Sequence, residues 1–231
     1  MKSRIVEIFQ SIQGEGKYVG AKQVFVRFLG CNLSCDWCDT TATGDSQQVS
    51  SEELSVEEVL SRVDEISQGC HAVSLTGGEP LLQKDFLRGL LPQLKKAGFI
   101  THLETNGVLF LEFSDLVDNV DVVAMDFKLP SSAKMSACWE EHARFLKVAV
   151  SHQKDVFVKI VVTLDTKEQD ICRARDIVAR EDKDTFCVLQ PETTEISSPL
   201  IKKCQEFQNI CLKSLSDVRI IPQVHKFINV R

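Results

Sequence analysis

Residues 24–38 read VFVRFLGCNLSCDWC, an apolar run that ends in three closely spaced cysteines. The run is too continuously apolar to have a face in water, as expected of a parallel strand that is covered by helices. Cys31, Cys35 and Cys38 follow it at C-x3-C-x2-C spacing, so that three thiolates can converge on one metal centre. The segment therefore predicts a buried strand with a metal-binding loop at its end.

The spacing alone leaves the kind of metal open. A structural zinc site usually has four ligands, and fully protein-ligated [4Fe–4S] clusters also use four cysteines. With three cysteines, one iron of such a cluster would keep an open position for a substrate or cofactor. The alternatives are a zinc loop that borrows a distant His or Cys, and a redox pair of the C-x2-C type.

Six further β-branched apolar runs lie along the chain, and amphipathic segments separate them. The expected strands are residues 24–29, 72–76, 100–104, 122–126, 156–162, 186–190 and 218–221. Expected helices include residues 85–96, 167–180, 199–212 and 56–67, the last with Ser55 as N-cap and Glu58 at the capping-box position. Alternating strands and helices predict an α/β fold with a parallel sheet. About six βα units are too few for a closed eightfold barrel, so we expect a partial, open βα barrel.

Polar or glycine-rich residues follow five of the seven expected strands. They stand at residues 31–38, 76–80, 104–107, 126–128 and 190–192. Because the carboxyl ends of parallel strands meet at one edge of the sheet, ligand chemistry is expected to gather there. The sequence therefore predicts one shared mouth that all five segments line.

Composition excludes several classes of protein. The 231 residues are 43% hydrophobic and 26% charged, and no repeat or linker divides them, so we expect a single domain over 1–231 with a covering segment at about 213–231. A formal net charge of −6 gives no electrostatic footprint for nucleic acid or an anionic membrane, and no apolar stretch is long enough for a span. Of the nine cysteines, six are scattered without a repeating framework, and the start of the chain lacks a signal-peptide layout. We therefore expect a cytoplasmic protein with reduced thiols and a possible metal site.

The three-cysteine loop, with Trp37 before its last cysteine, resembles the cluster loop of the radical S-adenosylmethionine enzymes. The second signature of that family is a glycine-rich strand end, here Thr76-Gly77-Gly78-Glu79-Pro80. Two glycines let the backbone approach a ligand closely, although Gly-Gly before Pro is by itself more often a turn. The resemblance implies that the open iron chelates S-adenosylmethionine and that the reduced cluster cleaves it to a 5′-deoxyadenosyl radical.

Segments on both sides of the loop resemble one particular family within this superfamily. They are IQGEG at 12–16, FVRFLGCNLSCDWCDT at 25–40, ETNG at 104–107, DFKLP at 126–130 and PQVHKFINVR at 222–231. Along nearly the whole chain these resemble the 7-carboxy-7-deazaguanine synthases, radical enzymes of the queuosine pathway. The resemblance implies that 6-carboxy-5,6,7,8-tetrahydropterin is converted to 7-carboxy-7-deazaguanine with loss of ammonia. It also implies Mg²⁺, a flavodoxin- or ferredoxin-like electron donor and a homodimer.

The same resemblance assigns site residues to each ligand. The cluster would be held by Cys31, Cys35 and Cys38, and Mg²⁺ by Thr40, with Asp39 as the rival ligand. Residues for S-adenosylmethionine would be Trp37, Cys38, Asp39, Gly78, Glu79, Glu104, Asp126, Phe127, Lys128, Gln190, Pro191, Glu192 and Thr193. Residues for the pterin would be Ile12, Gln13, Gly14, Glu15, Arg27, Thr76, His225 and Arg231. The assignments around 126–128 depart from the family pattern, because related sequences often have Ser-Pro-Lys there.

Residue chemistry supports parts of this assignment and leaves simpler interpretations open. A carboxamide and a carboxylate, as in Gln13 and Glu15, match the donors and acceptors of an aminopyrimidinone edge, but a Gly-flanked turn is the ordinary alternative. The guanidinium of Arg27 can bind a carboxylate with two hydrogen bonds, or it can extend from an edge strand to water. Asn106-Gly107 is by itself a common turn sequence.

Two other functions compete with this hypothesis. A glycyl-radical activating enzyme shares the three-cysteine loop, but it gives no reason for IQGEG, Arg27 or the Cys-Asp-Thr sequence at 38–40. An iron–sulfur or zinc module that only carries electrons gives no reason for GGEP or for the polar residues at five strand ends.

Overall fold

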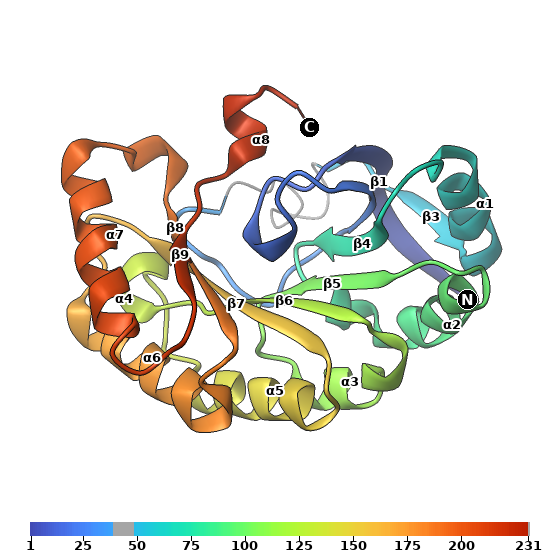
Figure 1. Ribbon diagram of the computed structural model, residues 1–231. Coiled ribbons are helices and arrows are strands. Elements are labelled where there is room, and N and C mark those ends of the chain that lie inside the picture. Colours follow the sequence, from blue (N-terminus) through green and yellow to red (C-terminus); the bar gives the residue numbers. More distant parts are fainter. Residues whose placement is uncertain (39–48, 231) are drawn as a thin grey trace.

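The computed structural model describes residues 1–38 and 49–230, and within them nine strands form a sheet in the order β3-β1-β2-β4-β5-β6-β7-β8-β9 (Figure 1). The strands are β1 (Lys2–Ile12), β2 (Lys22–Phe28), β3 (Glu52–Ser55), β4 (Ala72–Gly77), β5 (Thr101–Thr105), β6 (Val122–Asp126), β7 (Asp155–Val162), β8 (Phe186–Pro191) and β9 (Val218–Ile220). The helices are α1 (Val56–Ile66), α2 (Lys84–Lys96), α3 (Phe110–Ser114), α4 (Pro130–Ala133), α5 (Trp139–Ser151), α6 (Glu168–Asp182), α7 (Ser198–Cys211) and α8 (Val224–Phe227).

The strands from β2 onward, apart from the edge strand β3, are all parallel, and their curved sheet carries the helices on its outer face (Figure 1). Strands β3 and β9 stand at the two edges, so the barrel stays open, as the sequence predicted. All seven expected strands and all four expected helices are present. The capping box of α1 is also confirmed, because Ser55 and Glu58 each accept a hydrogen bond from the other's backbone N–H.

Apolar side chains between the sheet and the helices form the core. Strand β4 is buried from Ala72 to Thr76, as expected of a strand covered on both faces. Helix α2 buries Phe86, Leu87, Leu90, Leu91 and Leu94, a set at helical spacing that makes one face apolar. Each such side chain contributes about 1.5–3 kcal/mol through burial, which fixes the strand ends relative to one another.

Several elements lie outside the sequence prediction, among them β1, β3 and α5. Strand β1 pairs antiparallel with both β2 and β3, and helix α5 packs beside α6. The apolar pattern of β1 is interrupted by Glu7, which faces the cavity described below. A charged residue that faces a ligand cavity breaks the alternation by which strands are recognised.

The segment that follows β1 fills the interior of the open barrel. Its short 3-10 helix η1 (Gly16–Tyr18) places the Tyr18 ring 4.8 Å from the ring of His71 and 5.7 Å from that of His102, centre to centre. Tyr18 and Lys17 both pair with Asp155, which begins β7. Residues 13–15 directly precede this helix and line the cavity described below.

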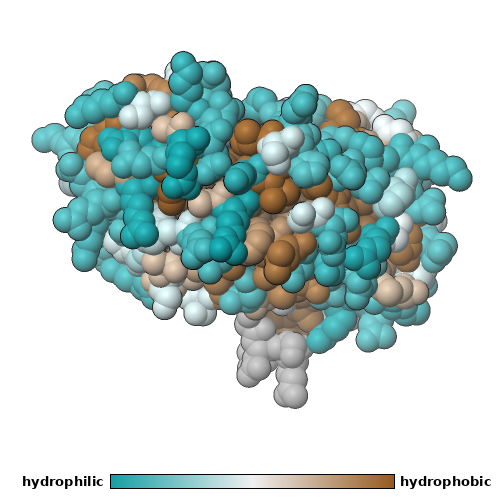
Figure 2. Space-filling view, turned by 90° about the horizontal axis from the view of Figure 1, so that it is seen from below, coloured by the Kyte–Doolittle hydropathy of each residue, from teal (hydrophilic) through white to brown (hydrophobic). Residues whose placement is uncertain are grey.

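Seen from below, the molecule is mostly hydrophilic, with some hydrophobic side chains grouped toward the middle of that face (Figure 2). None of the described helices is long and apolar enough to cross a bilayer.

Candidate active site

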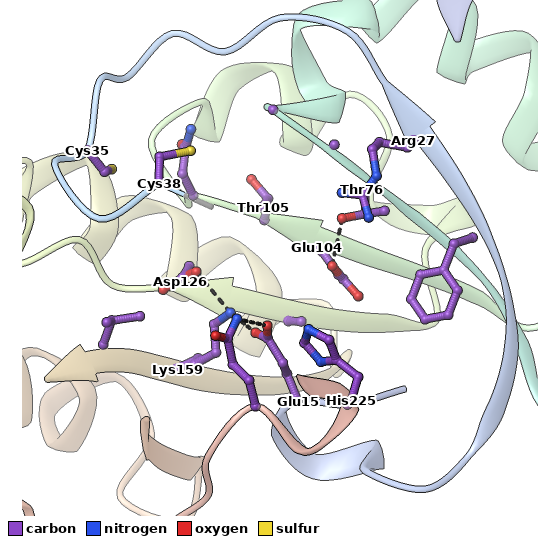
Figure 3. A pocket seen from close by; sticks show the side chains of 18 of the residues that line it. Glu15, Arg27, Cys35, Cys38, Thr76, Glu104, Thr105, Asp126, Lys159 and His225 are labelled. Atoms are coloured by element: carbon purple, nitrogen blue, oxygen red, sulfur yellow. Dashed lines mark hydrogen bonds and ion pairs between the residues drawn. The ribbon is translucent and has the colours of Figure 1, made fainter. Parts of the chain in front are cut away.

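A cavity of about 870 Å³ opens at the carboxyl ends of the parallel strands, where the sequence predicted a shared mouth. It is lined by residues from β1, β2, β4, β5, β6, β7 and β8, from the 31–38 loop and from the C-terminal segment. Two of the cysteines lie on one side of it, and Arg27, Thr76 and Glu104 lie on the other (Figure 3). The volume falls within the range of small-molecule sites in proteins.

Cys31, Cys35 and Cys38 line the same end of this cavity. The backbone N–H of Leu33 donates to the Cys31 sulfur at 3.4 Å, and the N–H of Cys38 donates to the Cys35 carbonyl at 3.2 Å. Burial raises the pKa of the Cys35 thiol to about 11, so a metal must displace a proton to bind there. Across residues 1–38 and 49–230, no three His, Cys, Asp or Glu side chains are drawn together around one point. The loop supplies three thiol donors, the set that leaves one iron of a four-iron cluster open.

Gly77 and Gly78 allow the backbone of this loop to pack closely against the end of β4. A Cβ at Gly78 would overlap the Gly30 carbonyl oxygen and lie 3.0 Å from Cys31 Cβ. Gly77 has φ +137°, and a Cβ there would overlap the backbone of Phe28. The backbone N–H of Glu79 then donates to the Gly30 carbonyl at 2.8 Å. The glycine pair is therefore required by the close approach of two backbones.

Three buried polar atoms of residues that line the cavity lack a hydrogen-bond partner among the described residues. They are Asp126 Oδ1, Gln190 Oε1 and Trp37 Nε1. The other oxygen of Asp126 pairs with Lys128 Nζ at 2.8 Å, and that ammonium lies 4.3 Å from the centre of the Trp37 ring. Buried polar groups in native structures nearly always have partners, so two acceptors and a donor here fit a polar ligand such as a nucleoside. These residues, together with the three thiols, fit S-adenosylmethionine on a cluster.

Glu104 lies on the far side of the cavity, beside Gln13. One of its oxygens accepts from Gln13 Nε2 at 2.8 Å and from Ser74 Oγ at 3.0 Å, and the other accepts from Thr76 Oγ1 at 2.7 Å. Burial would raise the pKa of Glu104, but His102 and these donors outweigh it and hold the pKa below its usual value. Glu104 was assigned to S-adenosylmethionine from the sequence, whereas the structure places its carboxylate among residues assigned to the pterin.

Arg27 lines the same side and is oriented by Glu7. Its Nε donates to Glu7 Oε1 at 2.8 Å, and the guanidinium carbon lies 5.8 Å from the centre of the Phe9 ring. Glu7 was not foreseen from the sequence, because an acidic residue in a short apolar run gives no indication of its direction. This pairing directs the Nε edge of the guanidinium toward β1.

Glu15 lies between the two sides of the cavity. Its Oε1 accepts from Gln223 Nε2 at 2.7 Å, and its Oε2 pairs with Lys159. The backbone N–H of Glu15 donates to Gln13 Oε1 at 3.0 Å, which holds the Gln13 side chain against the backbone of the loop. Lys159 was also missed; its only sequence signal was a charge inside the apolar run of β7.

The C-terminal segment closes over this loop. The N–H of Val224 donates to the Gly14 carbonyl at 2.9 Å, and a Cβ at Gly14 would overlap the His225 ring. His225, which the family resemblance assigned to the pterin, lines the cavity. The absence of a side chain at Gly14 therefore allows His225 and the C-terminal segment to pack against this loop.

Most residues predicted from the sequence line the one cavity. These are Ile12, Gln13, Gly14, Glu15, Arg27, Cys31, Cys35, Trp37, Cys38, Thr76, Gly78, Glu104, Asp126, Lys128, Gln190, Glu192, Thr193 and His225. Three others do not line it. Glu79 is buried and accepts from the N–H groups of Leu81 and Asn106, Phe127 packs on His142 with ring centres 4.4 Å apart, and Pro191 is buried. Asp39, Thr40 and Arg231 lie outside the described residues.

An open parallel barrel with a three-cysteine loop and a glycine-rich second strand end defines a radical S-adenosylmethionine protein. Residues 25–177 match the family described as the Radical SAM superfamily, and the chain belongs to it. It is 36% identical to the 7-carboxy-7-deazaguanine synthase of Geobacter sulfurreducens, over 98% of this chain and 97% of that protein. It is 30% identical to the 7-carboxy-7-deazaguanine synthase of Methanocaldococcus jannaschii, over 98% and 99% of the two chains. Within the superfamily, the chain therefore belongs to the 7-carboxy-7-deazaguanine synthase family.

A solved structure supports the fold. The crystal structure of QueE from Escherichia coli superposes with a TM-score of 0.68 at 24% sequence identity, over 97% of this chain and 95% of that one.

Proposed function

We propose that this protein is a radical S-adenosylmethionine lyase that converts 6-carboxy-5,6,7,8-tetrahydropterin to 7-carboxy-7-deazaguanine with loss of ammonia. One observation carries the proposal: a single cavity has three thiols at one end and a group of polar side chains, with Arg27, at the other. A reaction that begins at a cofactor and ends on a small heterocycle needs both ligands in one enclosed space.

At the cofactor end, Cys31, Cys35 and Cys38 would hold a [4Fe–4S] cluster, and Asp126, Gln190 and Trp37 would contact S-adenosylmethionine. When bound, these groups supply the radical that removes hydrogen from the substrate. The side chains have two tasks here: Asp126 and Gln190 complete hydrogen bonds that are unmade in the protein alone, and Lys128 keeps Asp126 in place. Burial would raise the pKa of Asp126, but Lys128 and Lys159 outweigh it, so the carboxylate stays ionised and accepts hydrogen bonds.

At the substrate end, Arg27 would bind the pterin carboxylate with the guanidinium N–H groups that Glu7 does not use. Glu15, Gln13 and Glu104 offer acceptors and a donor for the aminopyrimidinone ring. Phe9, Phe25 and Phe157 also line the cavity and exclude water from the ring between these polar groups. His225 would cover the ligand from the C-terminal side.

Further parts of the proposal rest on the family resemblance. We propose that Thr40, or Asp39 beside it, binds Mg²⁺, and that Arg231 reaches the pterin. The chain would function as one domain over 1–231 and as a homodimer, with a flavodoxin- or ferredoxin-like electron donor. We propose a cytoplasmic location, which the buried free thiols of Cys187, Cys204 and Cys211 support because thiols remain reduced there.

Anaerobic reconstitution tests this function against its rivals. Protein with iron and sulfide restored is given dithionite, S-adenosylmethionine, Mg²⁺ and the carboxypterin, and 5′-deoxyadenosine and 7-carboxy-7-deazaguanine are measured by mass spectrometry. We expect both products, and neither from a Cys35→Ser variant. Cofactor cleavage that needs an added protein substrate would support an activating enzyme, and a metal centre without any cleavage would support an electron carrier; either result would overturn the proposal.

A further inference from the structure

Lys159 stands where the two ends of the cavity meet. It lies in the middle of β7, and its ammonium pairs with Glu15 Oε2 and lies 3.1 Å from Asp126 Oδ2. In Figure 3 these three side chains point toward one another, and both ion pairs are drawn. The lysine side chain is only 17% exposed, so water screens these interactions weakly.

The two carboxylates reach Lys159 from different parts of the site. Asp126 ends β6 on the cysteine side, and its second oxygen is the unpartnered acceptor described above. Glu15 belongs to the loop that carries Gln13, on the side assigned to the pterin. One ammonium is thus shared by a residue of each proposed ligand subsite.

The backbone also fixes the lysine in place. Asp126 and Lys159 are register partners in the parallel pair of β6 and β7, and the N–H of Phe127 donates to the Lys159 carbonyl at 2.8 Å. Burial alone would lower the pKa of Lys159, but Asp126 and Glu15 outweigh it and raise the pKa, so the side chain stays cationic. A cation at a rigid strand position can hold two anions that would otherwise repel each other.

We infer that Lys159 is a positioning residue that couples the two ligand subsites, so that the ligand bound first strengthens the binding of the second. This inference rests on the proposed function. Because the ammonium bridges the two carboxylates, a ligand that holds Asp126 in its binding position also holds the ammonium and, through it, Glu15. The second ligand then meets a carboxylate that is already in its binding position, which is positive coupling, and linkage makes the coupling equal in both directions.

Binding to the reconstituted holoenzyme tests the coupling without turnover. With the cluster kept oxidised, the Kd of S-adenosylmethionine is measured by calorimetry with and without saturating carboxypterin. We expect the pterin to lower this Kd about fivefold or more in the wild type, and to leave it nearly unchanged in Lys159→Met, which keeps the length of the side chain without its charge.

Lys95→Met is the matched control. Lys95 forms a partly buried ion pair with Asp121, which directly precedes β6 at the opposite end of that strand from Asp126. This variant removes a comparable ion pair away from the cavity and should keep the wild-type coupling. Thermal melting of each variant shows whether it is folded, and Lys159→Gln replaces Lys159→Met if the latter does not fold.

The outcomes separate the coupling from the function. A pterin effect in Lys159→Met as large as in the wild type, or no pterin effect in the wild type, overturns the coupling even when the wild type forms 7-carboxy-7-deazaguanine. A wild type that neither binds the carboxypterin nor forms the product overturns the proposed function, and the coupling with it.

Discussion

Arg27 and Glu7 illustrate how single residues in this site depend on partners from other strands. The guanidinium of Arg27 carries five N–H groups in a fixed plane, and Glu7 engages the one on Nε. The remaining N–H groups can form a two-point contact with a carboxylate, which a lysine ammonium cannot reproduce. Glu7 therefore determines which edge of Arg27 faces the ligand.

We predict that Arg27→Lys raises the KM for the carboxypterin about tenfold or more, because a two-point contact between charged groups is lost. Steady-state kinetics under anaerobic conditions measure this value. The KM for S-adenosylmethionine serves as the control and should change much less, since Arg27 lies on the opposite side of the cavity from the cysteines. An unchanged pterin KM would show that Arg27 does not bind the substrate.

At the scale of elements, the 31–38 loop takes its place from the end of β4. The loop has few backbone hydrogen bonds of its own, and the N–H of Glu79 anchors it at the Gly30 carbonyl. Gly78 permits this contact because any side chain would displace the Gly30–Cys31 backbone. Two motifs that are separate in the sequence therefore form one structural unit.

We predict that Gly78→Ala folds but loses about half or more of its bound cluster, because the added methyl group pushes Cys31 away from the other two cysteines. Iron content and the visible absorbance of reconstituted protein measure the loss. Gly89→Ala in α2 is the control; the nearest atom to its new methyl group is 3.3 Å away, and alanine favours the helix. Equal iron content in both variants would contradict this account of Gly78.

At the scale of the whole molecule, the open barrel is completed by parts of the chain that are not strands. The segment around Tyr18 fills the interior, and the C-terminal segment covers the loop at Gly14. Two histidines are buried, His102 beside Tyr18 and His142 on α5, and burial lowers the pKa of His142 to about 4. The Nε2 atom of His142 lies 3.0 Å from the Asn106 carbonyl, and its ring packs on Phe127.

We predict that His142 makes the stability of the fold depend on pH. Its pKa is lower in the folded chain than in the unfolded one, where histidine titrates near 6.5, so the unfolded chain takes up the proton first. Neutral His142 makes its full contribution to the free energy of unfolding above about pH 6.5. This contribution is lost as the pH falls toward 4, by up to about 3 kcal/mol.

Denaturant unfolding of the metal-free protein between pH 7 and pH 5 measures this dependence. The free energy of unfolding should fall less steeply with pH in His142→Phe than in the wild type, whereas His152→Asn, at an exposed position, should follow the wild type. If the free energy of unfolding had the same pH dependence in His142→Phe and in the wild type, the pKa of His142 would be the same in the folded and unfolded chains, which would contradict the prediction.

The sequence by itself determined the seven parallel strands, the open barrel and the mouth at the strand ends, because burial on both faces leaves continuous apolar runs that local pattern reveals. The sequence also determined the cysteine loop, because Cys31, Cys35 and Cys38 are so close along the chain that one loop carries all three. Only the tertiary structure decided that Lys159 meets Glu15, 144 residues away, and that Glu104 faces Gln13. Those contacts depend on the register of the strands, because a one-residue shift in register would turn each side chain of the strand to the other face of the sheet.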